Sequence, residues 1–175
     1  MKAFEDIHKY ISLLLSDRLS ADLKLNFDLK HITCENQEFQ MFASDIPRFS
    51  YIALYKFKSR GILLLIDPKI VYVLTNRFLG GKGTIETKPK PLFTFSESFM
   101  AEKLVNWFSE FYAESHLDVK FLRVENNLDM VHFFYPDEQI YGVKMACKIN
   151  QKDIGNISCC YPKLIMDRRE SSWAT

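Results

Sequence analysis

The chain has 175 residues, of which 47% are hydrophobic and 14% aromatic, and its net charge is +1. This length and composition favour one folded domain with a sizeable core and exclude a disordered chain. The near-neutral charge gives no support for a nucleic-acid binder driven by bulk electrostatics. No apolar run approaches the roughly 18 residues of a membrane span, and the N-terminus shows no signal-peptide pattern. We therefore expect any membrane association to come through partners.

The first half of the chain is predicted to contain one long helix followed by four strands. Residues 3–19 carry apolar side chains on one helical face. Residues 22–31 alternate between apolar and polar side chains, which is typical of a half-buried strand. Further strands are predicted at 37–43, 49–58 and 61–66, and the continuous apolar run of the last one indicates a strand buried on both faces.

A second, shorter helix is predicted over residues 68–79. Asp67 suits the N-cap, and Pro68 suits the first helical position, where no backbone N–H is needed. Gly80 can adopt the left-handed conformation that ends a helix. The apolar positions at helical spacing are Ile70, Val71, Leu74 and Phe78.

The second half of the chain is predicted to repeat this plan. Residues 82–92 read as a loop, because they contain two prolines and few apolar side chains. Thr94 and Glu97 have capping-box spacing and open the longest helix, whose apolar stripe runs from Met100 to Tyr112. Strands are predicted at 118–125, 130–135, 138–149 and 154–160, and a final short helix starts at Tyr161-Pro162.

The order of elements predicts two similar halves. Each half runs from a long helix through several strands to a short helix opened by a proline, Pro68 or Pro162. The halves lie roughly ninety residues apart in our alignment of elements. The predicted fold is of the α/β (α+β) class: a three-layer α/β/α domain with a central, mainly antiparallel sheet and pseudo-two-fold repeated halves.

The four cysteines give no sign of a metal site or a disulfide framework. They are Cys34, Cys147, Cys159 and Cys160, with no CxxC pair, and adjacent Cys159 and Cys160 would point to opposite faces of a strand. We expect reduced thiols in a cytoplasmic protein, with at least one buried as a small hydrophobe. No bound metal or cofactor is predicted, and no catalytic triad can be argued from spacing.

The glycine-rich run Gly80-Gly81-Lys82-Gly83 follows the short helix. It differs from a phosphate-binding loop, which needs Ser or Thr after the lysine and lies at the N-terminus of a helix. At a helix C-terminus the helix dipole repels phosphate. Two interpretations remain open: a helix stop followed by a flexible turn, or a contact point where a partner's backbone approaches the bare glycines.

Several segments resemble one family when they are taken in order. They are Ile66-Asp67-Pro68 through Gly83, Phe93-Thr94-Phe95-Ser96-Glu97, Arg123-Val124-Glu125-Asn126-Asn127, Pro136-Asp137-Glu138 and Tyr161-Pro162. Together they resemble the middle domain of the flagellar motor switch protein family FliM, whose fold is shared with the CheC and CheX proteins. The resemblance covers residues 1–167 and leaves 168–175 as a C-terminal tail.

The resemblance implies a non-enzymatic component of the flagellar motor switch complex, or C-ring, serving motility and the direction of rotation. Its expected location is the cytoplasm, peripheral to the inner membrane. Expected partners are FliG and neighbouring copies of the chain in a ring. FliN and CheY are family partners whose usual binding segments we do not find here. The FliG-contacting residues implied are Asn76, Arg77, Gly80, Gly81, Lys82 and Gly83.

A CheC/CheX-type phosphatase of a phosphorylated response regulator is the alternative. Such enzymes resemble FliM in fold and carry a helix with Ser/Asp-xxx-Glu-xx-Asn spacing, in which the asparagine orients a water molecule. Ser98 and Glu102 match this spacing, but the next position in phase is Val105. Asn106 comes one residue late, about 100° around the helix, so an ordinary polar helix face is the better interpretation.

Overall fold

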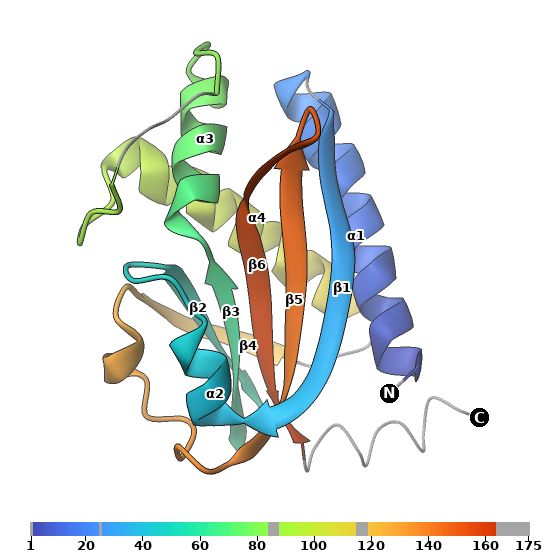
Figure 1. Ribbon diagram of the computed structural model, residues 1–175, viewed down its shortest axis with the longest axis vertical. Helices are drawn as coiled ribbons and strands as arrows, with labels where there is room; N and C mark the ends of the chain where they lie inside the picture. The colour runs from blue at the N-terminus through green and yellow to red at the C-terminus, as the bar shows by residue number, and fades with distance from the viewer. Residues whose placement is uncertain (1, 25, 84–87, 115–118, 164–175) are drawn as a thin grey trace.

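A six-stranded antiparallel sheet forms the centre of the molecule (Figure 1). The computed structural model describes residues 2–24, 26–83, 88–114 and 119–163. The strand order across the sheet is β1-β5-β6-β3-β2-β4, and every neighbouring pair is antiparallel. The strands are β1 (Phe27–Glu38), β2 (Tyr51–Phe57), β3 (Arg60–Ile66), β4 (Val119–Glu125), β5 (Gln139–Ile149) and β6 (Lys152–Pro162).

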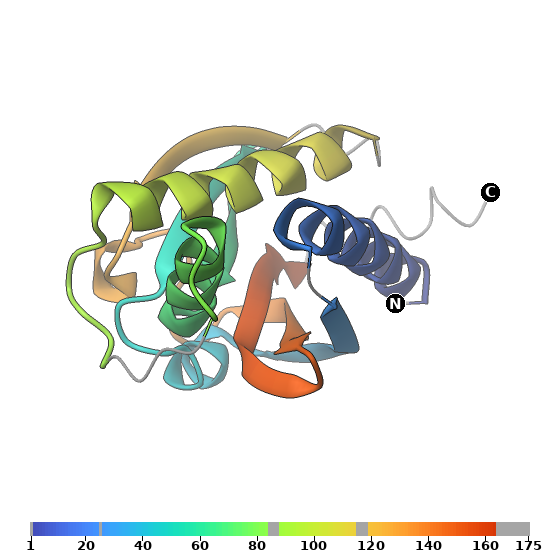
Figure 2. The ribbon, with the colours of Figure 1, turned by 90° about the horizontal axis from the view of Figure 1, so that it is seen from above.

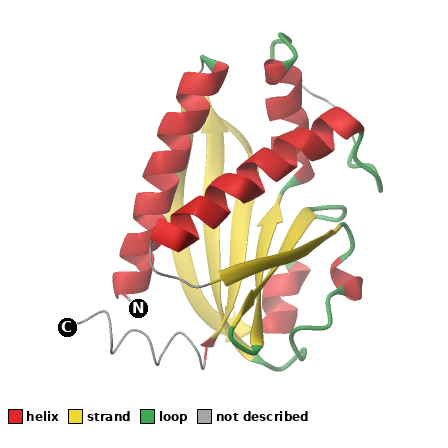
Figure 3. Ribbon diagram, turned by 180° about the vertical axis from the view of Figure 1, so that it is seen from behind, coloured by secondary structure: helices red, strands yellow, loops and turns green. Residues whose placement is uncertain are grey.

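Helices cover both faces of the sheet, but unequally (Figures 2 and 3). The three long helices pack over one face and enclose the main core, whereas the other face carries a smaller cluster around Phe42 and Leu63. The mixed class with an antiparallel sheet between helical layers is therefore confirmed, with one thin outer layer. The long helices are α1 (Lys2–Leu23), α3 (Pro68–Phe78) and α4 (Phe95–Glu114); the thin layer holds α2 (Phe39–Ser44) and the 3-10 helix η1 (Leu128–Met130).

The pseudo-two-fold repeat is confirmed by the topology. Exchanging β1, β2 and β3 for β4, β5 and β6 and reading the strand order backwards returns the same order. The central ladder has the same symmetry, since Leu63 pairs with Cys160 and Ile66 with Ile157. Ile157 follows Leu63 in the sequence at the same separation as Cys160 follows Ile66. Leu63 and Ile157 are therefore equivalent residues of the two halves, as are Ile66 and Cys160, and an approximate two-fold axis passes through this ladder.

The strand prediction for residues 22–31 placed the boundary too early. Helix α1 continues through Leu23, and β1 begins at Phe27 after a turn in which Lys24 has φ +50°. Leu23 ends a row of buried side chains with Leu15 and Leu19, spaced four residues apart along α1. Burial of that row against the core therefore extends the helix past the point where sequence alternation begins.

Two further strand predictions were wrong, because in each segment two buried apolar residues lie three positions apart, and this spacing outweighed the local strand propensity. Residues 39–44 form α2, whose Phe39 and Phe42 both face the smaller cluster. Residues 130–135 form no strand: Met130 ends η1, and Val131 and Phe134 of the segment after it reach the same cluster. In both segments the chain turns to place two apolar side chains on the sheet rather than extending along it.

The predicted final helix does not start at Tyr161-Pro162, because β6 continues to Pro162, and residues 164 onward, where most of that helix was predicted, lie outside the described residues. Tyr161 is fully buried and pairs with Tyr141 of β5, which holds the strand to its end. The expected boundary at 167/168 and the tail 168–175 lie outside the described residues.

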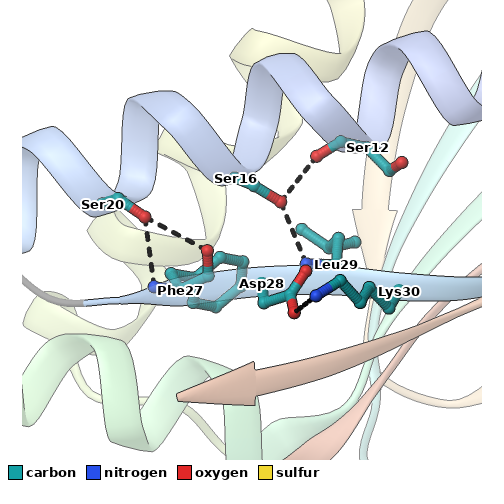
Figure 4. A network of polar contacts seen from close by, with 7 residues as sticks. All are labelled: Ser12, Ser16, Ser20, Phe27, Asp28, Leu29 and Lys30. Carbon is teal, nitrogen blue, oxygen red and sulfur yellow. Dashed lines mark hydrogen bonds and ion pairs between the residues drawn. The ribbon is translucent and has the colours of Figure 1, made fainter. Parts of the chain in front are cut away.

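The outer edge of β1 is covered by serines of α1 (Figure 4). The Phe27 amide donates to Ser20 Oγ at 3.1 Å, and the same hydroxyl donates back to the Phe27 carbonyl. The Leu29 amide donates to Ser16 Oγ at 2.9 Å, and Ser16 in turn donates to the Ser12 carbonyl. These contacts satisfy backbone groups that an edge strand otherwise leaves open.

Candidate functional site

Helix α3 begins as the sequence predicts. The Asp67 side chain accepts a hydrogen bond from the Lys69 amide at 2.8 Å, and Pro68 follows at the first helical position. The Asp67 amide donates to the Asn156 carbonyl of β6, which fixes the start of the helix against the centre of the sheet. Helix α3 therefore points its C-terminal end in a defined direction, away from the sheet (Figure 1).

The C-terminal end of α3 is a Schellman motif. Gly80 has φ +86°, its amide donates to the Arg77 carbonyl, and the Gly81 amide donates to the Asn76 carbonyl at 2.8 Å. This pair of bonds is the pattern that a left-handed residue after a helix permits. The predicted role of Gly80 as the helix stop is confirmed.

Two side chains of α3 close the glycine loop onto the helix. Asn76 Oδ1 accepts from the Gly83 amide at 2.8 Å, and Arg77 Nη1 donates to the Gly81 carbonyl at 3.0 Å. Arg77 Nε is buried with no hydrogen-bond partner among the described residues. The structure thus joins Asn76, Arg77, Gly81 and Gly83 in one hydrogen-bonded unit.

The closed loop itself requires glycine at residues 81 and 83. A Cβ at residue 81 would overlap the Asn76 amide, and a Cβ at residue 83 would lie 2.7 Å from Cγ and Cδ of Arg77. Gly83 also has φ +73°, a conformation that side chains disfavour. Among the loop glycines, only Gly80 has open space where a Cβ would lie. Gly80 and Lys82 are the exposed residues of the loop.

An exposed apolar patch adjoins the loop, and sequence reasoning missed it. Phe78 was expected on the buried face of α3, but half of its surface is exposed, because it lies beyond the end of the core. Its ring contacts Phe99 of α4 at a centroid distance of 6.2 Å. Phe95 and Phe99 stand one turn apart and off the apolar stripe of α4, which was the available signal. The α3–α4 apolar patch consists of Phe78, Leu79, Phe95 and Phe99.

Helix α4 does not offer the phosphatase arrangement. Its capping box is confirmed: the Thr94 amide donates to Glu97 Oε2, and the Glu97 amide donates to Thr94 Oγ1. Glu102 is exposed, but Val105, the position at which that helix would carry an asparagine, is buried in the main core. The side chain of Val105 is a hydrocarbon and has no amide group that could orient a water molecule.

The buried thiols have no reactive character. Cys159 faces the main core and Cys160 the smaller cluster, as the strand alternation predicts. Burial raises the pKa of Cys159 to about 12, so the thiol stays protonated at neutral pH and is a poor nucleophile. No group of three or more metal-ligating side chains occurs within the described part of the chain.

The comparisons with known proteins agree on one family. A family model for the flagellar motor switch protein FliM matches residues 1–170. The chain belongs to the FliM family. It is 19% identical over 173 residues to FliM of Bacillus subtilis, covering 95% of this chain and 52% of that protein. The chain thus spans about half the length of the FliM relatives that it matches.

Solved FliM structures share the fold. The FliG–FliM complex from H. pylori contains a chain that matches with a TM-score of 0.76 and 19% identity, over 92% of this chain and 91% of that one. A FliM middle domain (51–229) from Vibrio alginolyticus matches with a TM-score of 0.74 and 16% identity, over 94% and 96% of the two chains. At such identities, the match establishes the architecture.

Proposed function

We propose that this chain is a non-enzymatic component of the flagellar motor switch and that it binds FliG through the loop 80–83. Membership of the FliM family supports the first part. The second part is supported by the H. pylori complex, in which FliM is bound to FliG, and by the loop's exposed position at the tip of α3.

The closed glycine loop beside the α3–α4 apolar patch carries this proposal. Gly80 and Lys82 are exposed, and Phe78 and Leu79 lie directly before them in the chain. A partner surface can therefore approach bare backbone and bury aromatic rings in one contact. Asn76 and Arg77 act as positioning residues, since both hold the loop to the helix.

A calorimetric titration with the middle domain of FliG tests this assignment. Gly81→Asp places a side chain where the Asn76 amide lies and opens the loop, so we expect affinity to fall at least about tenfold. Asn76→Ala, which keeps every glycine but removes the loop's anchor, should weaken binding in the same direction. Gln40→Ala, which removes an exposed side-chain amide on α2 at the opposite end of the molecule from the tip of α3 (Figure 1), is the matched control and should bind as the wild type does.

Each result of this titration bears on the proposal. A folded Gly81→Asp protein, judged by its circular dichroism spectrum, that binds FliG unchanged overturns the loop as the contact. A wild-type protein that is folded and does not bind FliG overturns the partner.

Self-association in a ring is the second part of the proposed function. Helices α1 and α4 lie side by side on one face of the sheet and offer long exposed surfaces for contact between copies (Figure 3). Each contact is expected to be weak, because a closed ring gains strength from multiplicity. Sedimentation velocity over a concentration series should show reversible association, and a strictly monomeric chain at all concentrations would contradict it.

The proposed location is the cytoplasmic face of the inner membrane, reached through partners. Among the helices described, none is both long enough and apolar enough to cross a bilayer. Fractionation of cells with and without FliG is the direct measurement, and membrane association without FliG would contradict the proposal.

A further inference from the structure

The two edge strands of the sheet, β1 and β4, are related by the pseudo-two-fold axis, but their outer backbone groups have different hydrogen-bond partners. On β1, the amides of Phe27 and Leu29 bond to serines of α1 (Figure 4). On β4, which pairs only with β2, no bond from outside the sheet reaches the backbone within the described residues. The outer edge of β4 therefore retains a row of unused backbone donors and acceptors.

A cavity of about 790 Å³ lies on the face of the sheet between the β2–β3 turn and the 132–135 segment, and it reaches β4 at Leu122. Leu122, which is the extra residue of a bulge in β4, forms one wall. The Phe133 ring forms another and lies directly over Gly61, where a Cβ would overlap it. Leu122 and Tyr135 expose apolar surface at this cavity, and Ser59 and His132 add polar groups to its lining.

The charged groups around the cavity are mostly cations. Lys56 lines the cavity and stands directly opposite Lys120 of β4, and neither ammonium has a carboxylate partner among the described residues. Like charges opposite each other on a sheet are unfavourable. Arg60 is held at the wall by a 2.8 Å ion pair with Glu138, the carboxylate that belongs to this region. Lys56 and Lys120 therefore leave uncompensated positive charge beside an open strand edge.

The geometry points to a binding site for an acidic peptide. We propose that the outer edge of β4 pairs with an extended, acidic segment of a partner protein. The peptide's carboxylates would face Lys56 and Lys120, and an apolar side chain would enter the cavity between Leu122 and Phe133. Strand addition of this kind takes affinity from the backbone and specificity from alternate side chains. An acidic occupant is favoured because it removes the repulsion between the two lysines.

This site is separate from the glycine loop. Arg60 begins β3, and α3 follows β3 in the same direction, so the cavity and the loop lie at opposite ends of this unit (Figure 1). Failure of one proposal therefore leaves the other intact, since substitutions at one end can be made without touching the other.

The test uses the whole chain and a fluorescein-labelled peptide in which glutamate alternates with valine and phenylalanine. Fluorescence anisotropy measures its binding to the wild type and to the double variant Lys56→Glu with Lys120→Glu. We expect the double reversal to weaken binding at least about tenfold, because two attractions become repulsions. The matched control is Lys90→Glu with Lys152→Glu, which changes the net charge equally at exposed sites elsewhere.

Two modified peptides separate strand pairing from charge alone. A peptide with lysine in place of glutamate should not bind. Two peptides N-methylated on alternate amides, one for each edge, should differ, since only one edge of an added strand can pair with β4.

The remaining outcomes overturn the proposal. They are a wild type that does not bind the acidic peptide, equal weakening in both double variants, or equal affinity for both N-methylated peptides. A dimer of the wild type that dissociates in Lys56→Glu with Lys120→Glu would assign the edge to a second copy of the chain instead.

Discussion

Asn76 and Arg77 determine the shape of the glycine loop. The resemblance to FliM named both residues as partner contacts, whereas in the structure their side chains bond to Gly83 and Gly81. The helix caps at Asp67 and Gly80 could be predicted, because a cap is a local rule about residue type and position. The loop closure could not, because it depends on which way two helical side chains turn after the helix has ended.

Asp67 gives a prediction about pH. Burial raises the pKa of this carboxyl above 3.8, although the hydrogen bond from the Lys69 amide partly offsets the effect. A raised pKa in the folded state means that the contribution of Asp67 to stability is fully present below its unfolded pKa and is lost as pH rises through the folded pKa. Asp67→Asn keeps the capping oxygen but does not titrate.

Urea unfolding of wild type and Asp67→Asn at a series of pH values checks this expectation. The free energy of unfolding of Asp67→Asn should improve relative to the wild type as pH rises from 3 to 7. A difference that is independent of pH, or that changes in the opposite direction, would contradict a raised pKa at Asp67.

At the scale of elements, α1 and β1 form one unit joined by serine hydroxyls. Ser16 and Ser20 lie four residues apart on α1 and reach alternate residues of β1 (Figure 4). In the sequence these serines read as ordinary polar positions of an amphipathic helix. Their function depends on the register between helix and strand, which the periodicity of either element alone does not contain.

Ser16→Ala is expected to destabilise the protein by about 1–2 kcal/mol, because it leaves the Leu29 amide without its acceptor in a partly buried position. Urea unfolding gives the free energy, and hydrogen exchange should show faster exchange at Leu29. Ser44→Ala is the control, since its hydroxyl donates only to a carbonyl at the exposed end of α2. Equal costs in the two variants would argue against a specific role for Ser16.

The elements that sequence reasoning misjudged have a common physical cause. Phe39 and Met41 have the spacing of a strand, whereas Phe39 and Phe42 have that of a helical turn, and burial of Phe39 and Phe42 in the smaller cluster decides for the turn. The strands β3 and β5 were predicted well, because a continuous or strictly alternating apolar pattern over several residues admits fewer structures. Local patterns therefore identified the sheet, and tertiary contacts determined the connections.

At the scale of the whole molecule, the two halves meet along the β3–β6 ladder. Leu64 and Cys159 pair in this ladder and are fully buried in the main core. Tyr161 of β6 adds contacts between the halves, since its hydroxyl lies 2.8 Å from His8 Nε2 of α1 and 2.7 Å from the Tyr112 hydroxyl of α4. The repeat of elements predicted two similar halves, but not which strands meet at the axis.

Leu64→Ala should therefore destabilise both halves together, by about 3–5 kcal/mol for a large-to-small change in a closed core. Circular dichroism should show a single unfolding transition, and hydrogen exchange in β2 and β5 should rise in parallel. Leu13→Ala, at a position with 59% of its surface exposed, is the control and should cost little. Protection that persists in β5 while it is lost in β2 would contradict cooperative folding across the axis.

In the contact with FliG that we propose, the loop at the tip of α3 presents a backbone that the helix already holds in place. Its backbone groups are bonded to Asn76 and Arg77 before any partner is present, so association does not carry the entropy cost of ordering a segment. Contact and release at such a surface are limited by diffusion and by the strength of the contact, not by folding. A tip of this kind can attach and detach repeatedly without rearranging the domain that carries it.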